Sequence, residues 1–242
     1  MRFDGKDLRD AHRALSIEKE IPPGTARREI DTVSSADGEI ITLERIEQDE
    51  YIVRVNIACQ SADDAWDVRA KLAGWGALQR PGTAELIPTH WKGKCYDARL
   101  KSISAPEFTR GFGKVEMRFL LPRPIARDTA PSMAGGAGTM KVMIGGTYAC
   151  RPVIAQTIKT ARTGVEWDMD GVVFLALTGE LSAGQIVEMD TTKERLTIDG
   201  EDAMSRINYV KSKWRPGYTP GMHEIESSDG GALEMRWHNE WL

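Results

Sequence analysis

Residues 61–75 (SADDAWDVRAKLAGW) show the periodicity of a helix in a chain that otherwise alternates like strands. Ser61 is a good N-cap, because its hydroxyl can accept a hydrogen bond from the first turn, and Asp64 completes a capping box. Trp66 is expected in the core with the residues that recur on one face: Ala65, Val68, Leu72 and Trp75. Such a helix needs a sheet against that face. We therefore expect a mainly β fold with one helix over 61–75.

The segments before and after this helix predict the sheet. Residues 51–57 alternate between apolar and polar side chains, as a half-buried strand does, and residues 96–101 do the same. Residues 115–121 repeat the pattern and end at Pro122 and Pro124, which lack the N–H donors of a ladder. The pair Asp37-Gly38 tolerates the positive φ of a tight turn and predicts a hairpin.

The composition changes after residue 125. Residues 126–138 (ARDTAPSMAGGAG) are small and lack periodicity, so we predict a linker there between a first domain at 1–125 and a second at 139–231. Short strands at roughly ten-residue spacing, separated by Gly turns, predict a β-sandwich in the second domain. The last residues, 232–242, read as one more strand with two tryptophans.

The composition excludes several classes of protein. A net charge of −4 argues against general adhesion to nucleic acid or to anionic lipid. No apolar run approaches the length of a membrane helix, and the charged first residues lack a signal-peptide pattern. Three scattered cysteines, Cys59, Cys95 and Cys150, indicate neither a disulfide framework nor a zinc site, and they favour a reducing compartment.

No catalytic, cofactor-binding or metal-ligating set emerges from the sequence. Glu166, Asp168 and Asp170 alternate, but Asp-x-Asp-Gly departs from the calcium-loop pattern, and a solvated strand end running into a turn is the better interpretation. His223-Glu224 with His238 could form a metal site only in space; isolated histidines satisfied by hydrogen bonds are the better interpretation. We therefore predict a protein that is not an enzyme. The four histidines are His12, His90, His223 and His238.

Seven tryptophans are many for a chain of this length. Trp167 and Trp214 fall in the second half, where aromatic side chains of a β-sandwich can stack on sugar rings. Aromatic residues are more often packing residues than ligand contacts.

The order of several short motifs resembles the distal tail proteins (Dit) of phages with long non-contractile tails. These motifs are Phe3-x-Gly5-x-Asp7-Leu8, the Asp37-Gly38 hairpin, Ser61-Ala62-Asp63 at the helix start, Leu72-Ala73-x-Trp75 at its end, Leu-Pro-x-Pro after the strand 115–121, and residues 211–223 (KSKWRPGYTPGMH). In the last motif Arg215 separates Trp214 from Pro216, and His223 stands where the family has Asn.

The resemblance implies a structural protein of the virion. In that family a first β-sandwich domain with one helix closes into a hexameric ring, and a second domain is a galectin-like or carbohydrate-module-like sandwich. The final strand, within 232–242, would return to the first domain. The ring would join the tail tube to tail-tip proteins, including tail-associated lysin or fibre proteins, and help present host-adsorption proteins.

Further expectations follow from this resemblance. DNA would pass through the ring lumen without binding, and the chain would not insert into a membrane. It would be assembled in the bacterial cytoplasm and end in the tail tip of the virion. The alternative function is a carbohydrate-binding module that holds host-surface glycans through its second domain, with Trp167 and Trp214 as the stacking residues. A β-sandwich glycosidase or peptidase is a weaker rival, because no residue has an assigned acid, base or nucleophile role.

Overall fold

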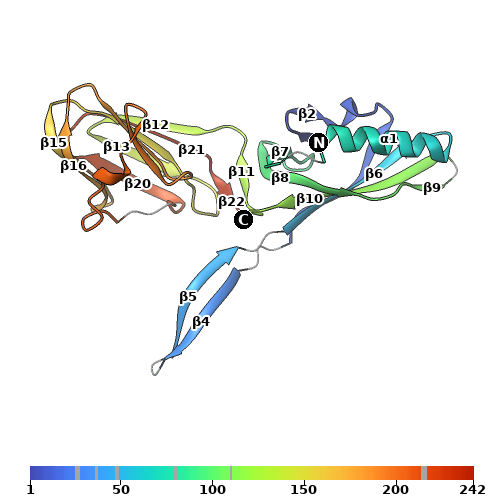
Figure 1. Ribbon diagram of the computed structural model, residues 1–242, viewed down its shortest axis with the longest axis horizontal. Coiled ribbons are helices and arrows are strands. Elements are labelled where there is room, and N and C mark those ends of the chain that lie inside the picture. Colours follow the sequence, from blue (N-terminus) through green and yellow to red (C-terminus); the bar gives the residue numbers. More distant parts are fainter. Residues whose placement is uncertain (25–27, 36–37, 47–48, 79–80, 110, 214–216) are drawn as a thin grey trace. The chain divides into compact units, whose positions relative to one another are not determined.

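The computed structural model describes residues 1–24, 28–35, 38–46, 49–78, 81–109, 111–213 and 217–242, with side chains for all of these except 28–46. The chain divides into two compact units (Figure 1). Unit 1 comprises Met1–Arg127 and Leu242, and unit 2 comprises Asp128–Trp241. The described residues lie mainly in β-strands with one α-helix, so the expected mainly β fold is confirmed.

The described part of unit 1 consists of strands, one α-helix and one short 3-10 helix. Its elements are β1 (Arg2–Phe3), β2 (Lys6–Asp7), the 3-10 helix η1 (Leu8–Asp10), β3 (Leu15–Ile21), β4 (Arg28–Ser35), β5 (Gly38–Ile46), β6 (Asp49–Ala58), α1 (Ala62–Trp75), β7 (Ala84–Ile87), β8 (Lys94–Ile103), β9 (Glu107–Thr109) and β10 (Phe112–Leu121). The main sheet runs in the order β2-β1-β7-β8-β10-β6-β3, and β3 is at one edge.

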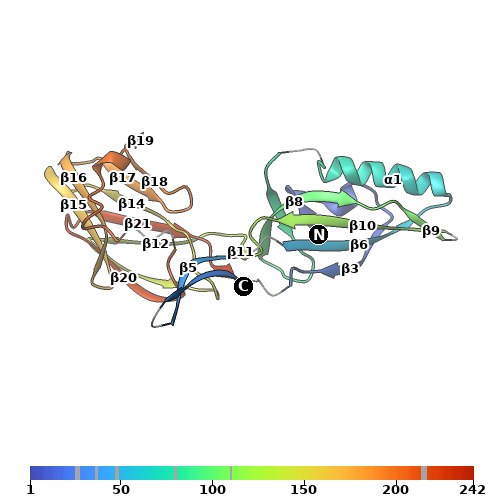
Figure 2. The ribbon, with the colours of Figure 1, turned by 60° about the horizontal axis from the view of Figure 1, so that its bottom comes forward.

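The helix α1 begins and packs as its sequence predicts. Ser61 accepts a hydrogen bond from the Asp64 N–H, and the Asp64 carboxylate accepts one from the Ser61 N–H, each at 3.1 Å. The predicted apolar face, which ends at Trp75, is buried. The Trp75 indole N–H donates to the Asp7 carbonyl at 2.9 Å, and its ring lies 5.8 Å from that of Phe3. These contacts fix the helix on the sheet (Figure 2).

Trp66 does not join this core. Its side chain is 49% exposed, because it lies outside the stripe that starts at Ala65. The Arg69 guanidinium lies 5.3 Å from the centre of its ring, a cation–π contact on the surface. The expectation of a buried Trp66 was wrong. It rested on the aromatic character of the side chain, whereas the position of Trp66 on the helix decides its exposure.

The central strands alternate as predicted. β6 and β10 pair antiparallel from Phe112↔Ala58 to Leu121↔Asp49. On both strands the apolar residues at alternate positions are buried. On the outer side Glu116 of β10 accepts hydrogen bonds from Arg54 and Arg118 at 3.0 and 2.9 Å. One face of the sheet therefore carries the core and the other carries ion pairs.

Strands β4 and β5 form a separate two-stranded sheet. Their register runs from Arg28↔Ile46 to Ser35↔Gly38, so the predicted hairpin is present. Its turn residue Asp37 lies outside the described residues. Among the described strands, β4 and β5 pair with each other alone.

Unit 2 contains strands and one short 3-10 helix. Its elements are β12 (Ser132–Ala137), β13 (Thr139–Ile144), β14 (Val153–Thr157), β15 (Arg162–Met169), β16 (Val172–Leu181), β17 (Ile186–Asp190), β18 (Arg195–Ile198), β19 (Glu201–Asp202), η2 (Met204–Arg206), β20 (Gly221–Ser227), β21 (Ala232–Trp237) and β22 (Glu240–Trp241). The strand β11 (Ala126–Asp128) spans the boundary between the units.

Two antiparallel sheets make unit 2 a β-sandwich. One has the order β12-β21-β14-β17-β18-β19 and the other β13-β20-β15-β16. Their inward side chains form one core, in which Ile154 and Trp167 are fully buried. The Trp167 indole N–H donates to the buried Gln156 side chain, which also accepts from Ser227 at 2.8 Å. The β-sandwich of short strands predicted for the second domain is therefore present.

The predicted linker at 126–138 is instead largely strand. β12 pairs along its whole length with β21, from Ser132↔Trp237 to Ala137↔Ala232. A Cβ at Gly136 would lie 2.3 Å from the Thr139 carbonyl oxygen, and one at Gly135 would lie 3.2 Å from that of Leu233. The small residues therefore reflect close backbone packing, which composition alone cannot distinguish from a linker.

The last strand was expected to return to the first domain. For most of its length this expectation is wrong. β21 lies between β12 and β14 in the six-stranded sheet of unit 2. Leu233 and Met235 face the core of that unit and are buried. Burial of these side chains holds 232–237 in unit 2.

Candidate functional site

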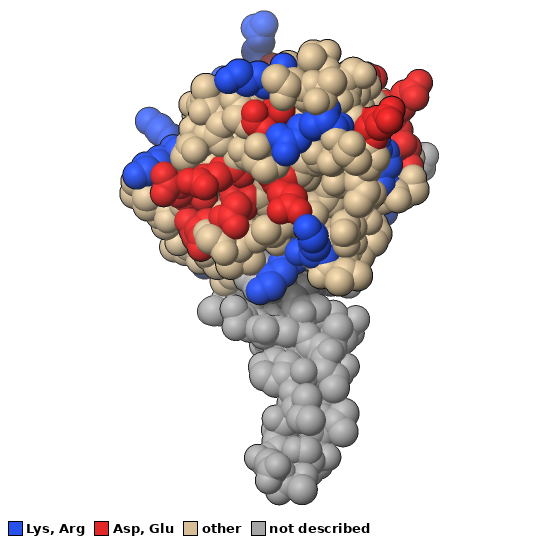
Figure 3. Space-filling view, turned by 90° about the vertical axis from the view of Figure 1, so that its left-hand side faces the viewer, with Lys and Arg blue, Asp and Glu red and all other residues tan. Residues whose placement is uncertain are grey.

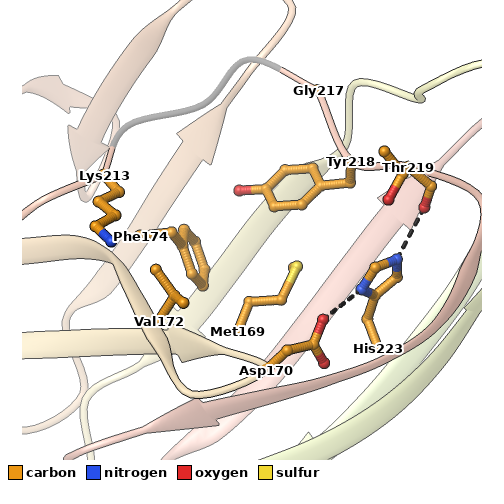
Figure 4. A pocket seen from close by; sticks show the side chains of 9 residues that line it. All are labelled: Met169, Asp170, Val172, Phe174, Lys213, Gly217, Tyr218, Thr219 and His223. Atoms are coloured by element: carbon orange, nitrogen blue, oxygen red, sulfur yellow. Dashed lines mark hydrogen bonds and ion pairs between the residues drawn. The ribbon is translucent and has the colours of Figure 1, made fainter.

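A pocket of about 250 Å³ opens in unit 2 where the turn between β15 and β16, Lys213, residues 217–219 and β20 meet (Figure 4). Its lining residues come from segments about fifty positions apart in the sequence. They are Met169, Asp170, Val172, Phe174, Lys213, Gly217, Tyr218, Thr219 and His223.

The floor of the pocket is apolar. Met169 and Phe174 are buried members of β15 and β16. The Tyr218 ring meets the Phe174 ring edge-on, with 5.9 Å between ring centres and 83° between planes. Tyr218 is fixed by its backbone, whose N–H and C=O both bond to Cys150 at 2.9 Å. The aromatic wall is therefore set by the fold.

The Tyr218 hydroxyl is buried without a hydrogen-bond partner among the described residues. Burial, and secondarily the nearby Cys150, raises the pKa of Tyr218 well above its usual value. The hydroxyl therefore keeps its proton and remains a donor. Buried polar groups without partners are uncommon in folded proteins, so this one requires an explanation.

One wall of the pocket is a hydrogen-bonded chain through His223. Its Nδ1 lies 2.6 Å from the Asp170 carboxylate, and its Nε2 lies 2.8 Å from the Thr219 carbonyl oxygen. Because both neighbours are acceptors, His223 can donate to both only as the doubly protonated imidazolium. The Glu224 N–H, and secondarily His223, holds the pKa of Asp170 below its usual value.

Lys213 stands across the pocket from this wall (Figure 4). Its backbone N–H donates to the Val173 carbonyl at 3.1 Å, which fixes it beside the edge of β16. Among the described residues its ammonium group has no ion pair, whereas the neighbouring Lys211 binds Glu166 at 2.9 Å.

Unit 1 contains a second histidine–carboxylate pair. The Glu20 carboxylate accepts hydrogen bonds from the Tyr51 hydroxyl at 3.0 Å and from the Thr89 N–H and hydroxyl at 3.0 and 2.6 Å, and it lies 2.8 Å from His90 Nδ1. Burial would raise the pKa of Glu20, but the bonds from Thr89, His90 and Tyr51 outweigh it and hold that pKa below its usual value. Both oxygens of the buried Glu20 carboxylate are therefore engaged by neighbours within unit 1.

The structure excludes one of the two sugar-stacking residues. Trp167 is fully buried in the unit 2 core, so it cannot stack on a ligand at the surface. Trp214 lies outside the described residues. Trp167 therefore cannot be part of the predicted glycan-binding surface, because its side chain packs inward from β15.

The acidic run and the histidines occupy separate environments. Glu166 pairs with Lys211, Asp168 accepts from the Gly171 N–H at 2.6 Å, and Asp170 lies in the turn, as the strand-end interpretation predicted. His238 bonds the Asp128 carbonyl at 2.6 Å, not the partners of His223. Within the described part of the chain, no three His, Cys, Asp or Glu side chains are grouped as metal ligands.

The surface charge and the helices of the described residues do not point to another functional site. Figure 3 shows acidic side chains gathered on the face of unit 2 that is turned to the viewer. Among the described residues, no helix has the length and apolar character that crossing a membrane requires.

Sequence reasoning missed the pocket as an assembly. It considered Asp170 and His223 separately, and it took Tyr218 only as part of the motif 211–223. The positive φ of Asp170 (54°) follows from the Asp170-Gly171 turn, which the sequence does reveal. The pairing of that turn with a residue 53 positions later depends on sheet topology, which no local pattern encodes.

Comparisons with known proteins agree with the fold. Residues 145–241 match the family described as siphovirus-type tail component, C-terminal domain. The solved structure of the Dit protein (gp 19.1) of phage SPP1 is similar over 99% of this chain and 98% of that one, with a TM-score of 0.77 and 16% identity. A chain of the phage P2 baseplate in its activated conformation with Ca aligns over 93% of this chain and 90% of that one, with a TM-score of 0.46 and 11% identity. A search of curated protein sequences found no match.

The family match and the fold match concern overlapping parts of the chain. The first covers nearly all of unit 2, and the second extends the likeness across unit 1 with its single helix. Residues 145–241 therefore match the C-terminal domain of the siphovirus-type tail components, and the chain as a whole has the fold of the SPP1 Dit protein.

Proposed function

We propose that the protein forms a hexameric ring that connects the end of the tail tube to the tail tip and helps present host-adsorption proteins. The similar SPP1 protein is described as a paradigm of the hub adsorption apparatus in phages that infect Gram-positive bacteria. The same role for this chain places it in the virion, with tail-tube and tail-tip proteins as partners and DNA passing through the lumen.

The observation that carries the ring is the hairpin β4–β5. Among the described strands it pairs only with itself. A two-stranded hairpin is at best marginally stable in water, because it has no second layer on which to bury a face. A neighbouring subunit would supply that layer, and contact between different patches of successive subunits closes a ring when the rotation closes.

The edge strand β3 offers a second contact surface. Among the described strands it pairs with β6 alone and ends the main sheet of unit 1, which leaves one side of its backbone for pairing. Its exposed residues carry mixed charge, including Glu18 and Lys19, and the register shifts between Ile17 and Lys19. Bulges and charges of this kind discourage indiscriminate pairing, so any subunit that docks here has to match this particular edge.

Native mass spectrometry with negative-stain imaging tests the ring. We expect six copies around a pore for the full chain. A variant in which a short Gly-Ser turn replaces residues 28–46 should be monomeric, with an unchanged circular dichroism spectrum apart from the lost strands. Met143→Ser, which changes an exposed side chain of unit 2, is the matched control and should keep six copies.

Two outcomes contradict this proposal. One is a full chain that stays monomeric at high micromolar concentration even with tail-tube protein added. The other is a hairpin-deleted chain that still forms six-membered rings, which would assign closure to other surfaces.

A further inference from the structure

We propose that the pocket of unit 2 binds an oxyanion, a carboxylate or phosphate group carried by a small organic molecule, through the Tyr218 hydroxyl and the Lys213 ammonium group. The apolar part of the ligand would rest on Phe174 and Met169. This inference stands on unit 2 alone and does not depend on ring formation.

The Tyr218 hydroxyl requires an acceptor. It is buried and protonated, and no described residue accepts its proton. Figure 4 shows it directed along the pocket toward the side on which Phe174 and Lys213 lie. A buried donor without a partner destabilises the empty pocket. An acceptor oxygen bound there would relieve this penalty, which favours binding.

Lys213 favours an acceptor that carries a negative charge. Its ammonium group has no ion pair among the described residues and lies on the same side of the pocket as the Tyr218 hydroxyl. A hydroxyl and an ammonium group are both donors, and two donors that face one space suit an acceptor with two oxygens. Carboxylate and phosphate groups have such pairs of oxygens, and bonds to charged acceptors are the stronger ones.

The nearby carboxylate does not cancel this arrangement. Asp170 is engaged on both oxygens, by His223 on Oδ2 and by the Glu224 N–H on Oδ1. The two ring nitrogens of His223 are likewise directed to Asp170 and Thr219. This wall is internally paired, so the Tyr218 hydroxyl and the Lys213 ammonium group are the donors that remain for a ligand.

The volume limits the ligand. Pockets for drug-sized molecules usually measure about 300–1,000 Å³. A pocket of about 250 Å³ therefore admits a ring-sized group. The buried aromatic floor of Phe174 and Tyr218 favours a flat apolar body on that group.

Saturation-transfer NMR on the full chain provides the test, because it detects weak ligands on large assemblies. Benzoate and phenyl phosphate are the two anionic probes, and benzyl alcohol is the neutral control of similar shape. We expect at least one anion to bind at least tenfold more tightly than benzyl alcohol, and added NaCl should weaken that binding. The anion that binds distinguishes a carboxylate from a phosphate source.

Three variants assign the binding to these residues. Tyr218→Phe and Lys213→Gln should each weaken the anion at least tenfold. Lys211→Gln is the matched control, since Lys211 pairs with Glu166 and does not line the pocket. Tyr218→Phe should also unfold thermally at the same temperature as the parent or higher, because it removes an unpaired buried hydroxyl.

Several results would overturn the inference. Equal binding of benzyl alcohol and both anions would contradict the proposed preference for an oxyanion, as would failure of both anions to bind. Unchanged anion affinity in Lys213→Gln, whose exposed side chain is not needed for folding, would remove the assigned site. A lowered unfolding temperature for Tyr218→Phe would show that the hydroxyl already has a partner.

Discussion

In the described part of the chain, each unit contains one histidine–carboxylate pair of similar length, but the burial of the two partners is reversed. In unit 1 the Glu20 side chain is 6% exposed and that of His90 is 45% exposed. In unit 2 the His223 side chain is 14% exposed and that of Asp170 is 48% exposed. The distances are 2.8 and 2.6 Å.

This reversal separates a structural cluster from a candidate binding site. In unit 1 the buried partner is an acceptor surrounded by donors, so the carboxylate is satisfied and fixes the residues around Thr89 to β3. In unit 2 the more buried partner is the donor, and the neighbouring Tyr218 hydroxyl stays unsatisfied. The two pairs therefore differ in what lies beside them: the pair in unit 2 is next to a buried donor that needs an explanation.

The largest effect is expected for Glu20→Gln. The amide keeps the shape but loses the charge that strengthens the bonds from Tyr51 and Thr89, so unfolding should require about 2 kcal/mol less. Urea denaturation measures the loss, and hydrogen exchange of peptides from β3 and residues 88–91 locates it.

A neighbouring residue provides the control for that variant. Glu18 lies on the same strand, and its 38% exposed side chain pairs with Lys114. Glu18→Gln should change stability by less than about 0.5 kcal/mol, as is usual for exposed pairs. Equal effects of the two substitutions would contradict the contrast between a buried and an exposed carboxylate.

A smaller effect is expected for Asp170→Asn. Asn tolerates the positive φ of this turn and can still accept from the Glu224 N–H, so the main loss is the charged bond to His223. Unfolding of the full chain should require about 1 kcal/mol less. If hydrogen exchange of residues 217–223 does not rise in this variant, His223 is not held by Asp170.

The smallest effect is a change in acid sensitivity. The folded pKa of Glu20 is lowered from its ordinary value of 4.5, so its contribution is complete above about pH 4.5 and is lost as the pH falls through the lowered folded pKa. The stability difference between the parent and Glu20→Gln should therefore shrink between pH 5 and pH 3. Urea titrations across this range measure it, and a constant difference would show that the pKa is not lowered.

The sequence predicts those parts of the fold whose cause is local. Ser61 with Asp64 defines the start of α1, and alternation in β6 and β10 identifies their buried faces. Trp66 and β12 were misassigned because exposure of one helical position and close backbone packing depend on neighbours distant in the sequence. For the same reason the pocket was not predicted: Asp170 and Tyr218 meet only through the register of β15, β16 and β20.

The pairing of β12 with β21 also bears on how unit 2 can be exchanged. The first complete strand of this unit and its next-to-last strand are neighbours, with Ser132 opposite Trp237, so the chain enters and leaves the sandwich about one strand spacing apart. Adjacent entry and exit points let a module be inserted into or removed from a host chain without stretching it. Exchange of this one stretch by recombination would thus replace the whole sandwich and leave Met1–Arg127 unchanged.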